Sequence, residues 1–164
     1  MSDTPRIELK VLDPRLHQWG LPRYQTSLAA GIDLIACLDA RVVVAPQAPA
    51  ILVPTGLAMH MNATGYCALI LPRSGLGHKR GLVLGNGTGV IDADYTQQCF
   101  VSVWNRNPAG DGDGIAIEPG DRIAQMVFVP IVRPRFDIVD EFNSPSARVG
   151  GFGSTGLSGS ASGS

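Results

Sequence analysis

Short runs of apolar and β-branched residues alternate with polar residues along most of the chain, and Gly, Pro, Asn or Asp separates one run from the next. Runs of this kind are typical of β-strands. They fall at residues 41–45, 50–53, 57–61, 66–71, 100–104, 115–117, 126–132 and 136–139. Clean helical periodicity is limited to a single predicted turn at residues 74–79. We therefore expect an all-β fold, an antiparallel sandwich or barrel such as a jelly roll.

The end of the chain, residues 143–164, is dominated by Gly and Ser. Such a segment buries too little apolar surface to order itself, so a disordered terminus is one interpretation. Arg148 and Phe152 lie among the glycines, and a cation with an aromatic ring on a flexible arm also suits a lid that orders over a ligand. Composition leaves both interpretations open. We expect a β-barrel domain at residues 1–142 and a C-terminal arm at residues 143–164.

The bulk composition limits the partners. A chain of 164 residues favours one domain with its own core. Lys and Arg total 13 against 14 Asp and Glu, which argues against a nucleic-acid partner but leaves room for a small anionic ligand. The N-terminus has no apolar signal-peptide core, and no stretch is long enough to span a bilayer. We expect a cytoplasmic protein with no membrane partner.

The chain contains three cysteines, Cys37, Cys67 and Cys99, which are widely spaced among apolar residues. Free cysteines in such surroundings are usually small core residues, so we interpret them as buried reduced thiols. No cluster of Cys and His has the spacing of a zinc site.

The segment LPRSGLG, residues 71–77, follows a predicted strand and opens the predicted helical turn. Backbone N–H groups at the start of such a turn attract anions, and the guanidinium of Arg73 fits phosphate oxygens. With Ser74 and Gly75 it forms a candidate anion site. An ordinary surface turn explains the same three residues.

Two further segments place polar residues within apolar runs. In GDRIAQMVF, residues 120–128, the interruptions are Arg122 and Gln125, for which surface side chains after a turn are the simpler interpretation. In AAGIDLIA, residues 29–36, Asp33 alternates with apolar neighbours. A buried carboxylate needs hydrogen bonds or a function, whereas a solvated outer face needs neither.

The segment GNGTGVIDADY, residues 85–95, is the most informative. Its glycines suit a tight hairpin whose backbone approaches a ligand closely and reads a nucleobase edge. Strand alternation after the hairpin would place Asp92 and Asp94 on one face, where one carboxylate could serve as a base. A surface acidic strand is the alternative. We expect a small enzyme that acts on a nucleotide at this segment.

Five segments, taken in order, resemble the motifs of the homotrimeric deoxyuridine triphosphatases: AGIDLIA, LPRSGLGHKRG, GNGTGVIDADY, GDRIAQMVF and GGFGSTG. The resemblance also includes VPTGLAMH and VSVWNR, and it extends over residues 7–156. It implies a jelly-roll β-barrel that assembles as a trimer. In this family, the C-terminal arm of one subunit closes over an active site made by the other two.

By that resemblance, the reaction is the Mg²⁺-dependent hydrolysis of dUTP to dUMP and pyrophosphate. It would limit uracil incorporation into DNA and supply dUMP for dTMP synthesis. Asp92 would be the general base that activates a water against the α-phosphorus, and Tyr95 would pack under deoxyribose and exclude a ribose. The residues that would read uracil are Asn86, Gly89, Val90 and Ile91.

The resemblance also assigns the phosphate and arm contacts. The phosphates would be held by Arg73, Ser74, Gly75 and Gln125. The arm would contribute Arg148, Phe152, Gly153, Ser154 and Thr155, with Phe152 stacking on uracil and Arg148 meeting the γ-phosphate. Mg²⁺ would bind through the substrate phosphates with no direct protein ligand, and Asp33 would assist it through water.

The chain departs from the family pattern at three places. Leu28-Ala29 replaces the usual Gly-Ser, Gln97 replaces Gly, and Arg148 stands four residues before Phe152 instead of five.

Two other functions remain to be weighed. A deoxycytidine triphosphate deaminase of the same fold needs a catalytic Glu near the hairpin, but no Glu lies between Glu8 and Glu118. A nucleotide-sensing or protein-binding module that has lost activity is the other, and the presence of Asp92 and Tyr95 counts against it.

Overall fold

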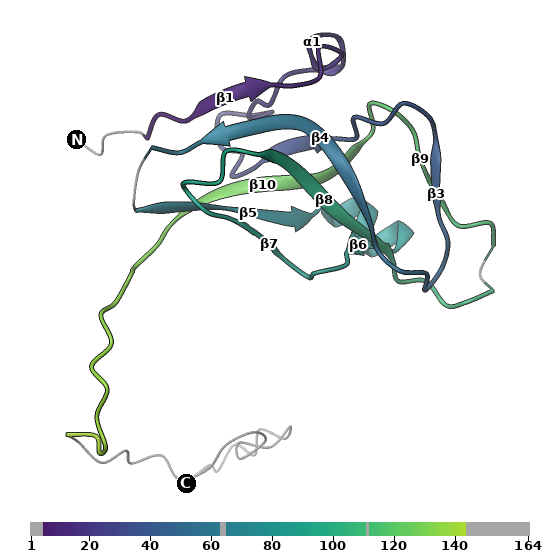
Figure 1. Cartoon of the computed structure of the whole chain (residues 1–164). Coiled ribbons are helices and arrows are strands. Elements are labelled where there is room, and N and C mark those ends of the chain that lie inside the picture. Colours follow the sequence, from purple (N-terminus) through teal and green to yellow (C-terminus); the bar gives the residue numbers. More distant parts are fainter. Residues whose placement is uncertain (1–4, 63–64, 111, 144–164) are drawn as a thin grey trace, which may run out of the picture. The chain divides into compact units, whose positions relative to one another are not determined.

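The computed structural model describes residues 5–62, 65–110 and 112–143, and within them it is built almost entirely of strands. One antiparallel sheet has the order β1 (Glu8–Val11), β4 (Ile51–His60), β8 (Gln98–Asn105) and β6 (Leu82–Leu84). A second has the order β2 (Ile32–Ile35), β10 (Arg122–Pro130), β5 (Tyr66–Pro72) and β7 (Gly89–Ile91). A third pairs β3 (Val42–Val44) with β9 (Ile115–Ile117) (Figure 1).

Two short helical segments join these strands. The helix α1 (Leu16–Trp19) follows β1, and the π-helical turn η1 (Leu76–Arg80) follows β5. The turn predicted at residues 74–79 is confirmed. No helix among the described residues has the length and apolar character needed to cross a membrane.

The core lies between the two four-stranded sheets, whose inward side chains form one apolar cluster. In β8 the buried residues Cys99, Val101 and Val103 alternate with more exposed neighbours, as the period of a strand requires. Each fully buried apolar side chain of this size contributes about 1.5–3 kcal/mol. The all-β fold predicted from the pattern is confirmed.

Two predicted strands, at residues 50–53 and 57–61, are one strand in the structure. The pairing of β4 with β8 shifts between Pro54 and Ala58, so an irregularity bends β4 without ending it. Pro54 therefore marks a bulge within β4 and not the end of a strand.

The strand predicted at residues 136–139 is wrong, because these residues form no regular structure. Phe136 and Ile138 are 87% and 101% exposed. Alternating apolar residues form a strand only when they pair with another strand and bury one face, and residues 136–139 pair with no strand among the described residues.

The chain divides into two units, Met1–Val132 and Arg133–Ser164. The first holds all the helices and strands described above. Residues 144–164 lie outside the described residues, and with them Arg148, Phe152, Gly153, Ser154 and Thr155. The boundary expected after residue 142 stays a prediction.

All three cysteines are free and buried, as predicted. Burial raises the pKa of the Cys37 thiol to about 11 and also raises the pKa of Cys99. Both thiols therefore stay protonated at neutral pH and act as core residues.

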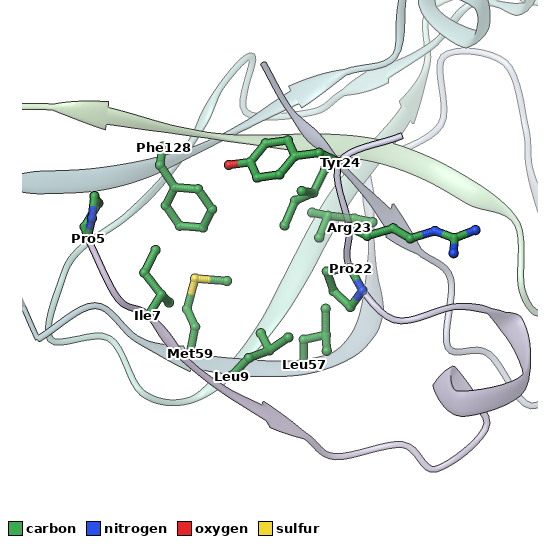
Figure 2. Close-up of a pocket in the computed structure, with 11 residues that line it drawn as sticks. Pro5, Ile7, Leu9, Pro22, Arg23, Tyr24, Leu57, Met59 and Phe128 are labelled. Atoms are coloured by element: carbon green, nitrogen blue, oxygen red, sulfur yellow. The ribbon is translucent and has the colours of Figure 1, made fainter. Parts of the chain in front are cut away.

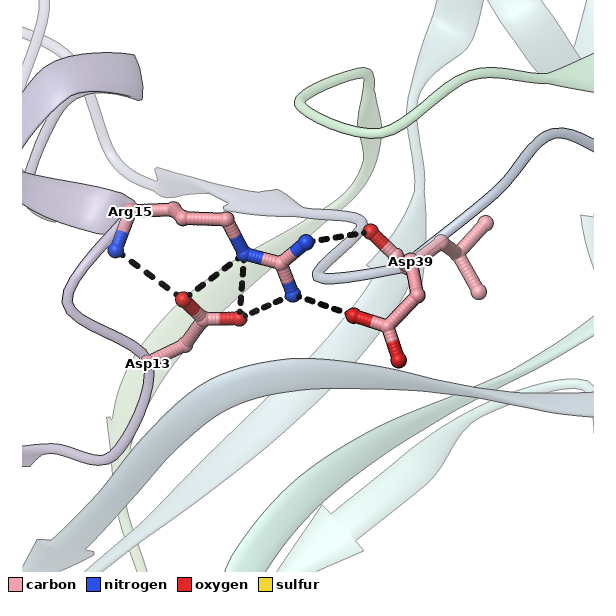
Figure 3. Close-up of polar contacts among 4 residues, drawn as sticks. Asp13, Arg15 and Asp39 are labelled. Carbon is pink, nitrogen blue, oxygen red and sulfur yellow. Dashed lines mark hydrogen bonds and ion pairs between the residues drawn. The ribbon is translucent and has the colours of Figure 1, made fainter.

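Arg15, in the segment between β1 and β2, links this segment to the loop that follows β2 (Figure 3). The guanidinium of Arg15 binds the carboxylate of Asp13 at 2.6 Å, the carbonyl of Leu38 at 2.9 Å and the exposed carboxylate of Asp39 at 3.0 Å. It also stacks on Trp19, 5.0 Å from the ring centroid. A Cβ added to Gly120 would meet the Trp19 ring at 3.2–3.3 Å, so this ring packs directly on the turn that starts β10.

Candidate active site

A pocket of about 460 Å³ at the end of β5 gathers residues from three of the motifs. Asp33 comes from β2 and Gln125 from β10, while the other residues come from the turn after β5 and from η1. Its lining consists of Asp33, Arg73, Ser74, Gly75, Leu76, Lys79, Arg80 and Gln125. The residues expected to hold phosphates therefore lie together.

Lys79 and Arg80 line this pocket but were not predicted as site residues. The run His-Lys-Arg at residues 78–80, directly after the anion motif, was the signal that could have found them. The turn that carries them is held by its neighbours, since Asn107 donates to the carbonyl of Arg80 at 2.9 Å and Arg106 donates to the carbonyl of Gly77 at 3.1 Å. These bonds satisfy carbonyls at the end of the turn.

Asp33 lies between two arginines. Its Oδ1 is 3.0 Å from Nε of Arg73, and its Oδ2 is 3.2 Å from Nη1 of Arg122. Arg73 also donates from Nη1 to the backbone carbonyl of Arg122 at 3.0 Å. The prediction that Asp33 alternates with buried neighbours is confirmed, but its outer face is a polar network and not open solvent.

Gln125 lies opposite Asp33 in the register of β10 and β2, so both side chains are on the same face of the sheet. Its amide donates to the carbonyl of Pro72 at 3.0 Å. This bond joins β10 to the start of the turn that carries Arg73 and Ser74. One amide hydrogen remains for a ligand.

The charge of this pocket favours an anion. Arg73, Lys79 and Arg80 line it together with a single carboxylate, that of Asp33. Arg122, which does not line the pocket, forms an ion pair with the same carboxylate. A triphosphate would therefore enter a site with excess positive charge, supplemented by the hydroxyl of Ser74.

The Gly-rich segment is a crossover and not the expected hairpin. β6 pairs with β8 in one sheet, and β7 pairs with β5 in the other, so residues 85–88 connect the two sheets. Gly87 has φ of 72°, which a glycine adopts without strain, and its N–H donates to the carbonyl of Leu84 at 3.2 Å. Asn86 is exposed, which leaves its amide available to a ligand.

The expected strand placement of the two carboxylates is wrong. β7 ends at Ile91, and a turn follows in which the N–H of Tyr95 donates to the carbonyl of Asp92 at 3.1 Å. Asp92 and Asp94 are both exposed in this turn, so strand alternation does not apply to them. The hydroxyl of Tyr95 donates to the carbonyl of Gln98 at 3.0 Å and fixes the ring. Gln97 is exposed.

The two halves of the predicted site lie at opposite ends of β5. Ile91 pairs with Ala68, so Asp92 follows beside Cys67, whereas Arg73 follows the other end of the strand. Arg73 stands six positions after Cys67, which corresponds to about 20 Å at the usual rise along a strand. Figure 1 shows β5 and β7 running side by side between these two ends.

A second, apolar pocket of about 410 Å³ lies elsewhere in the first unit (Figure 2). Side chains of Ile7, Leu9, Met59 and Phe128 point into it. None of the predicted site residues within the described part of the chain lines it. It therefore exposes apolar surface without catalytic groups.

No group of three or more His, Cys, Asp or Glu residues suited to a metal ion is present among the described residues. A divalent cation at the phosphate pocket would have to take most of its ligands from a bound anion and from water.

Comparison with known proteins gives the family. A model of the dUTPase family matches residues 17–156. The deoxyuridine 5'-triphosphate nucleotidohydrolase of Enterobacter sp. (strain 638) is 55% identical over 152 residues, which cover 92% of this chain and 97% of that protein. The protein of the same name from Aeromonas salmonicida (strain A449) is 54% identical over 154 residues, covering 93% and 98%.

Solved structures give the same result. The dUTPase of Staphylococcus bacteriophage 80alpha with dUPNHPP has a TM-score of 0.79 at 30% identity, covering 94% of this chain and 100% of that chain. A variant dUTPase from phage phi11 of S. aureus, solved to describe the coordination of a structural Mg(II) ion, has a TM-score of 0.71 at 27% identity, covering 85% and 99%. The jelly-roll-like fold and the family predicted from the motifs are confirmed, and the chain belongs to the dUTPase family.

Proposed function

We propose that this chain hydrolyses dUTP to dUMP and pyrophosphate with Mg²⁺, the reaction for which its relatives are named. The observation that carries the proposal is the cationic pocket formed by Arg73, Ser74, Gly75 and Gln125, which suits a triphosphate. Phosphoryl transfer needs positioning and charge neutralisation more than covalent help from the protein.

Asp92 acts as the general base of the reaction. Its carboxylate takes a proton from a water whose oxygen forms a bond to the α-phosphorus. The bond from that phosphorus to the bridging oxygen breaks, and pyrophosphate leaves. The exposed position of Asp92 in the turn after β7 supports this role, since a base has to reach a water beside the substrate.

The crossover and the turn beside Asp92 bind the nucleoside. The residues assigned to uracil are Asn86, Gly89, Val90 and Ile91. Tyr95 packs under deoxyribose, and the hydrogen bond from its hydroxyl to Gln98 supports a fixed ring that leaves no room for a 2′-hydroxyl. Backbone groups of a short turn suit this task because they approach a base edge closely.

The C-terminal arm closes over the substrate. Its assigned contacts are Arg148, Phe152, Gly153, Ser154 and Thr155, with Phe152 stacking on uracil and Arg148 meeting the γ-phosphate. The motif GGFGSTG supports this part of the proposal. Closure of such an arm excludes water other than the nucleophile.

The residues at the phosphate pocket fit a magnesium ion held chiefly by the substrate. The pocket offers one carboxylate, Asp33, whose two oxygens already accept from Arg73 and Arg122. Such a carboxylate can still accept from a water of the ion, which agrees with its expected indirect role. When bound, Mg²⁺ supplies charge neutralisation on the phosphate oxygens.

The separation of Asp92 from Arg73 supports an active site shared between copies of the chain. A general base works within about 3 Å of the water it activates, whereas about 20 Å of β5 lies between these two residues. Asp92 of one copy would complete the phosphate pocket of another. We propose the homotrimer of the family.

The proposal includes a cytoplasmic location and no membrane or nucleic-acid partner. The near balance of 13 basic and 14 acidic residues supports the absence of a nucleic-acid partner. Fractionation of cells that express the chain would test the location, and recovery in a membrane fraction would contradict it.

Product analysis tests the reaction. The purified chain is incubated with Mg²⁺ and each deoxynucleoside triphosphate in turn, and pyrophosphate and ammonia are measured. Pyrophosphate from dUTP alone is the expected result. Ammonia from dCTP would indicate a deaminase instead, and tight dUTP binding without turnover would indicate a binding module.

A further inference from the structure

We propose that Arg122 is a positioning residue that holds Asp33, so that Arg73 keeps its free N–H groups for the substrate phosphates. This inference rests on the proposed function, since it requires a phosphate at Arg73. It assigns a task to a residue that neither the motifs nor the phosphate pocket assigned.

A bulge in β10 places Arg122 on the correct face of the sheet. The pairing of β10 with β2 shifts between Arg122 and Ala124, so β10 has one residue more than its partner there. Ile123 and Ala124 are consequently both buried, at 3% and 0% exposure, although they are neighbours. Without the bulge, Arg122 and Ala124 would lie on the same face of the strand, and Arg122 would point into the core. With it, Arg122 lies on the face that carries Asp33 and Gln125.

The donors of Arg73 are divided between the protein and the pocket. Its Nε is taken by Asp33, and one hydrogen of Nη1 is taken by the carbonyl of Arg122. A guanidinium has five N–H groups, so within the described part of the chain the Nη2 pair remains for a ligand together with the second hydrogen of Nη1. This is the arrangement that binds a phosphate through two parallel hydrogen bonds.

Loss of the Arg122 side chain would change that division. The Asp33 side chain is 17% exposed, and its Oδ2 would lose its cationic partner. Among the described residues, Arg73 is the other cation in contact with this carboxylate. A carboxylate accepts a guanidinium most favourably as a two-pronged pair, so Asp33 would draw a second donor of Arg73 away from the ligand.

Arg122 itself does not line the phosphate pocket; it lines a neighbouring pocket that shares Arg73, Leu76 and Arg80 with it. Among the described residues, the Arg122 side chain makes its polar contact with this site at Asp33. Its effect on phosphate binding would therefore pass through Asp33. A residue that acts through another produces a non-additive effect when both are changed, and this property makes the inference testable.

The test combines Arg122→Met with Asp33→Asn. In the otherwise wild-type chain, R122M should raise KM for dUTP, and the dissociation constant of a non-hydrolysable dUTP analogue, about tenfold, within the usual range of coupling between contacting groups. The value of kcat and the binding of deoxyuridine, which has no phosphate, should stay within about twofold. R122K, which keeps one donor for Asp33, should recover most of the affinity.

The coupling is measured by adding R122M to the D33N chain, where it should have no further effect on KM. Arg41→Met is the matched control, because Arg41 is an exposed arginine whose ion pair, at 3.4 Å, is with Glu118 and not with Asp33. It should leave KM unchanged. This control separates loss of a positive charge from loss of the Asp33 contact.

Three results would overturn the inference while leaving the function intact. R122M could leave KM unchanged in a chain that hydrolyses dUTP. It could raise KM equally with and without D33N, which would indicate direct contact with the substrate. It could also weaken deoxyuridine binding as much as analogue binding, which would indicate a damaged fold. Absence of dUTP turnover in the wild-type chain would instead overturn the proposed function and the inference with it.

Discussion

At the residue scale, Asp92 and Tyr95 occupy a short turn that is held by one backbone hydrogen bond and one side-chain hydrogen bond. The N–H of Tyr95 donates to the carbonyl of Asp92, and the hydroxyl of Tyr95 donates to that of Gln98. The carboxylate of Asp92 is exposed, so a nucleotide can approach it without displacing protein. These features suit the roles proposed for the two residues, Asp92 as a general base and Tyr95 as the ring that packs under deoxyribose.

Replacement of Asp92 by Asn should lower kcat for dUTP by about 100- to 10,000-fold, the usual contribution of a positioned base. The affinity for a non-hydrolysable dUTP analogue should change little, because Asn has nearly the same shape. Steady-state kinetics and calorimetry measure the two quantities. Asp94→Asn, in the same turn, is the control and should keep most of the activity. Near-normal turnover by D92N would refute the assignment of the base.

The sequence predicted part of the pocket proposed for phosphate. Arg73 and Ser74 are indicated by a motif that combines a turn signal with polar side chains, whereas the role of Gln125 follows from the family resemblance alone. Arg122 was assigned to the surface because its position depends on the bulge in β10, and a pattern of period two does not reveal an inserted residue. Tertiary pairing, not local preference, decides on which face it lies.

At the scale of elements, α1 connects β1 to the turn before β10 through Asp13, Arg15 and Trp19, a set of contacts that we call the bracket. Asp13 and Arg15 hold its N-terminal end (Figure 3). Trp19 packs on Gly120. Gly120 and the following residue exchange backbone bonds of 2.9 and 2.8 Å with Ala36 at the end of β2. The bracket therefore supports the strand ends from which Asp33 and Arg122 project.

The pH dependence of stability tests this bracket. Hydrogen bonds from Arg15 hold the pKa of Asp13 below its ordinary value of 3.8. A carboxylate with a lowered pKa stabilises the folded chain above its unfolded pKa and loses that contribution as the pH falls through the folded value. Asp13→Asn should thus lower the free energy of unfolding at pH 7, and the difference from wild type should shrink below about pH 4.

Urea titrations at pH 7 and pH 3 measure this difference. Asp39→Asn is the matched control, since Asp39 pairs with the same guanidinium but is 96% exposed, and such pairs contribute little. An equal loss for D13N at both pH values would contradict the role of the ionised pair.

Element boundaries were less predictable than element type. Pro54 was interpreted as a strand end, but the chain bulges there and β4 continues because its partner β8 is long enough to pair on both sides. Phe136 and Ile138 have the alternation of a strand but no buried face among the described residues. Whether β4 continues and whether residues 136–139 form a strand both depend on the available pairing partners. The local sequence pattern carries no information about those partners.

Removal of residues 143–164 should lower kcat/KM for dUTP by more than about tenfold, because a closing arm contributes to substrate positioning. The thermal unfolding of the remaining chain should stay within a few degrees, since the apolar core lies before residue 132. Kinetics and circular dichroism measure the two effects. An unchanged rate would refute the arm as a lid.

At the scale of the whole molecule, the position of the motifs along β5 and β7 supports the proposal that more than one copy of the chain builds each site. Asp92 and Arg73 are proposed to serve one reaction, but they lie at opposite ends of paired strands. In an assembly with closed rotational symmetry, the Asp92 end of β5 in one copy would lie at the Arg73 end of β5 in its neighbour. The same site would then be repeated in each copy. The molar mass in solution should be three times that of one chain.

Mixed assembly of two inactive chains tests the shared site most directly. Arg73→Gln and Asp92→Asn are purified separately, then unfolded and refolded together in equal amounts. Random assembly should give each shared site an intact Asp92 and an intact Arg73 from different copies in about one quarter of cases, so about a quarter of the wild-type dUTP turnover should return. Turnover no greater than the sum of the two separate variants would contradict a site built by more than one copy.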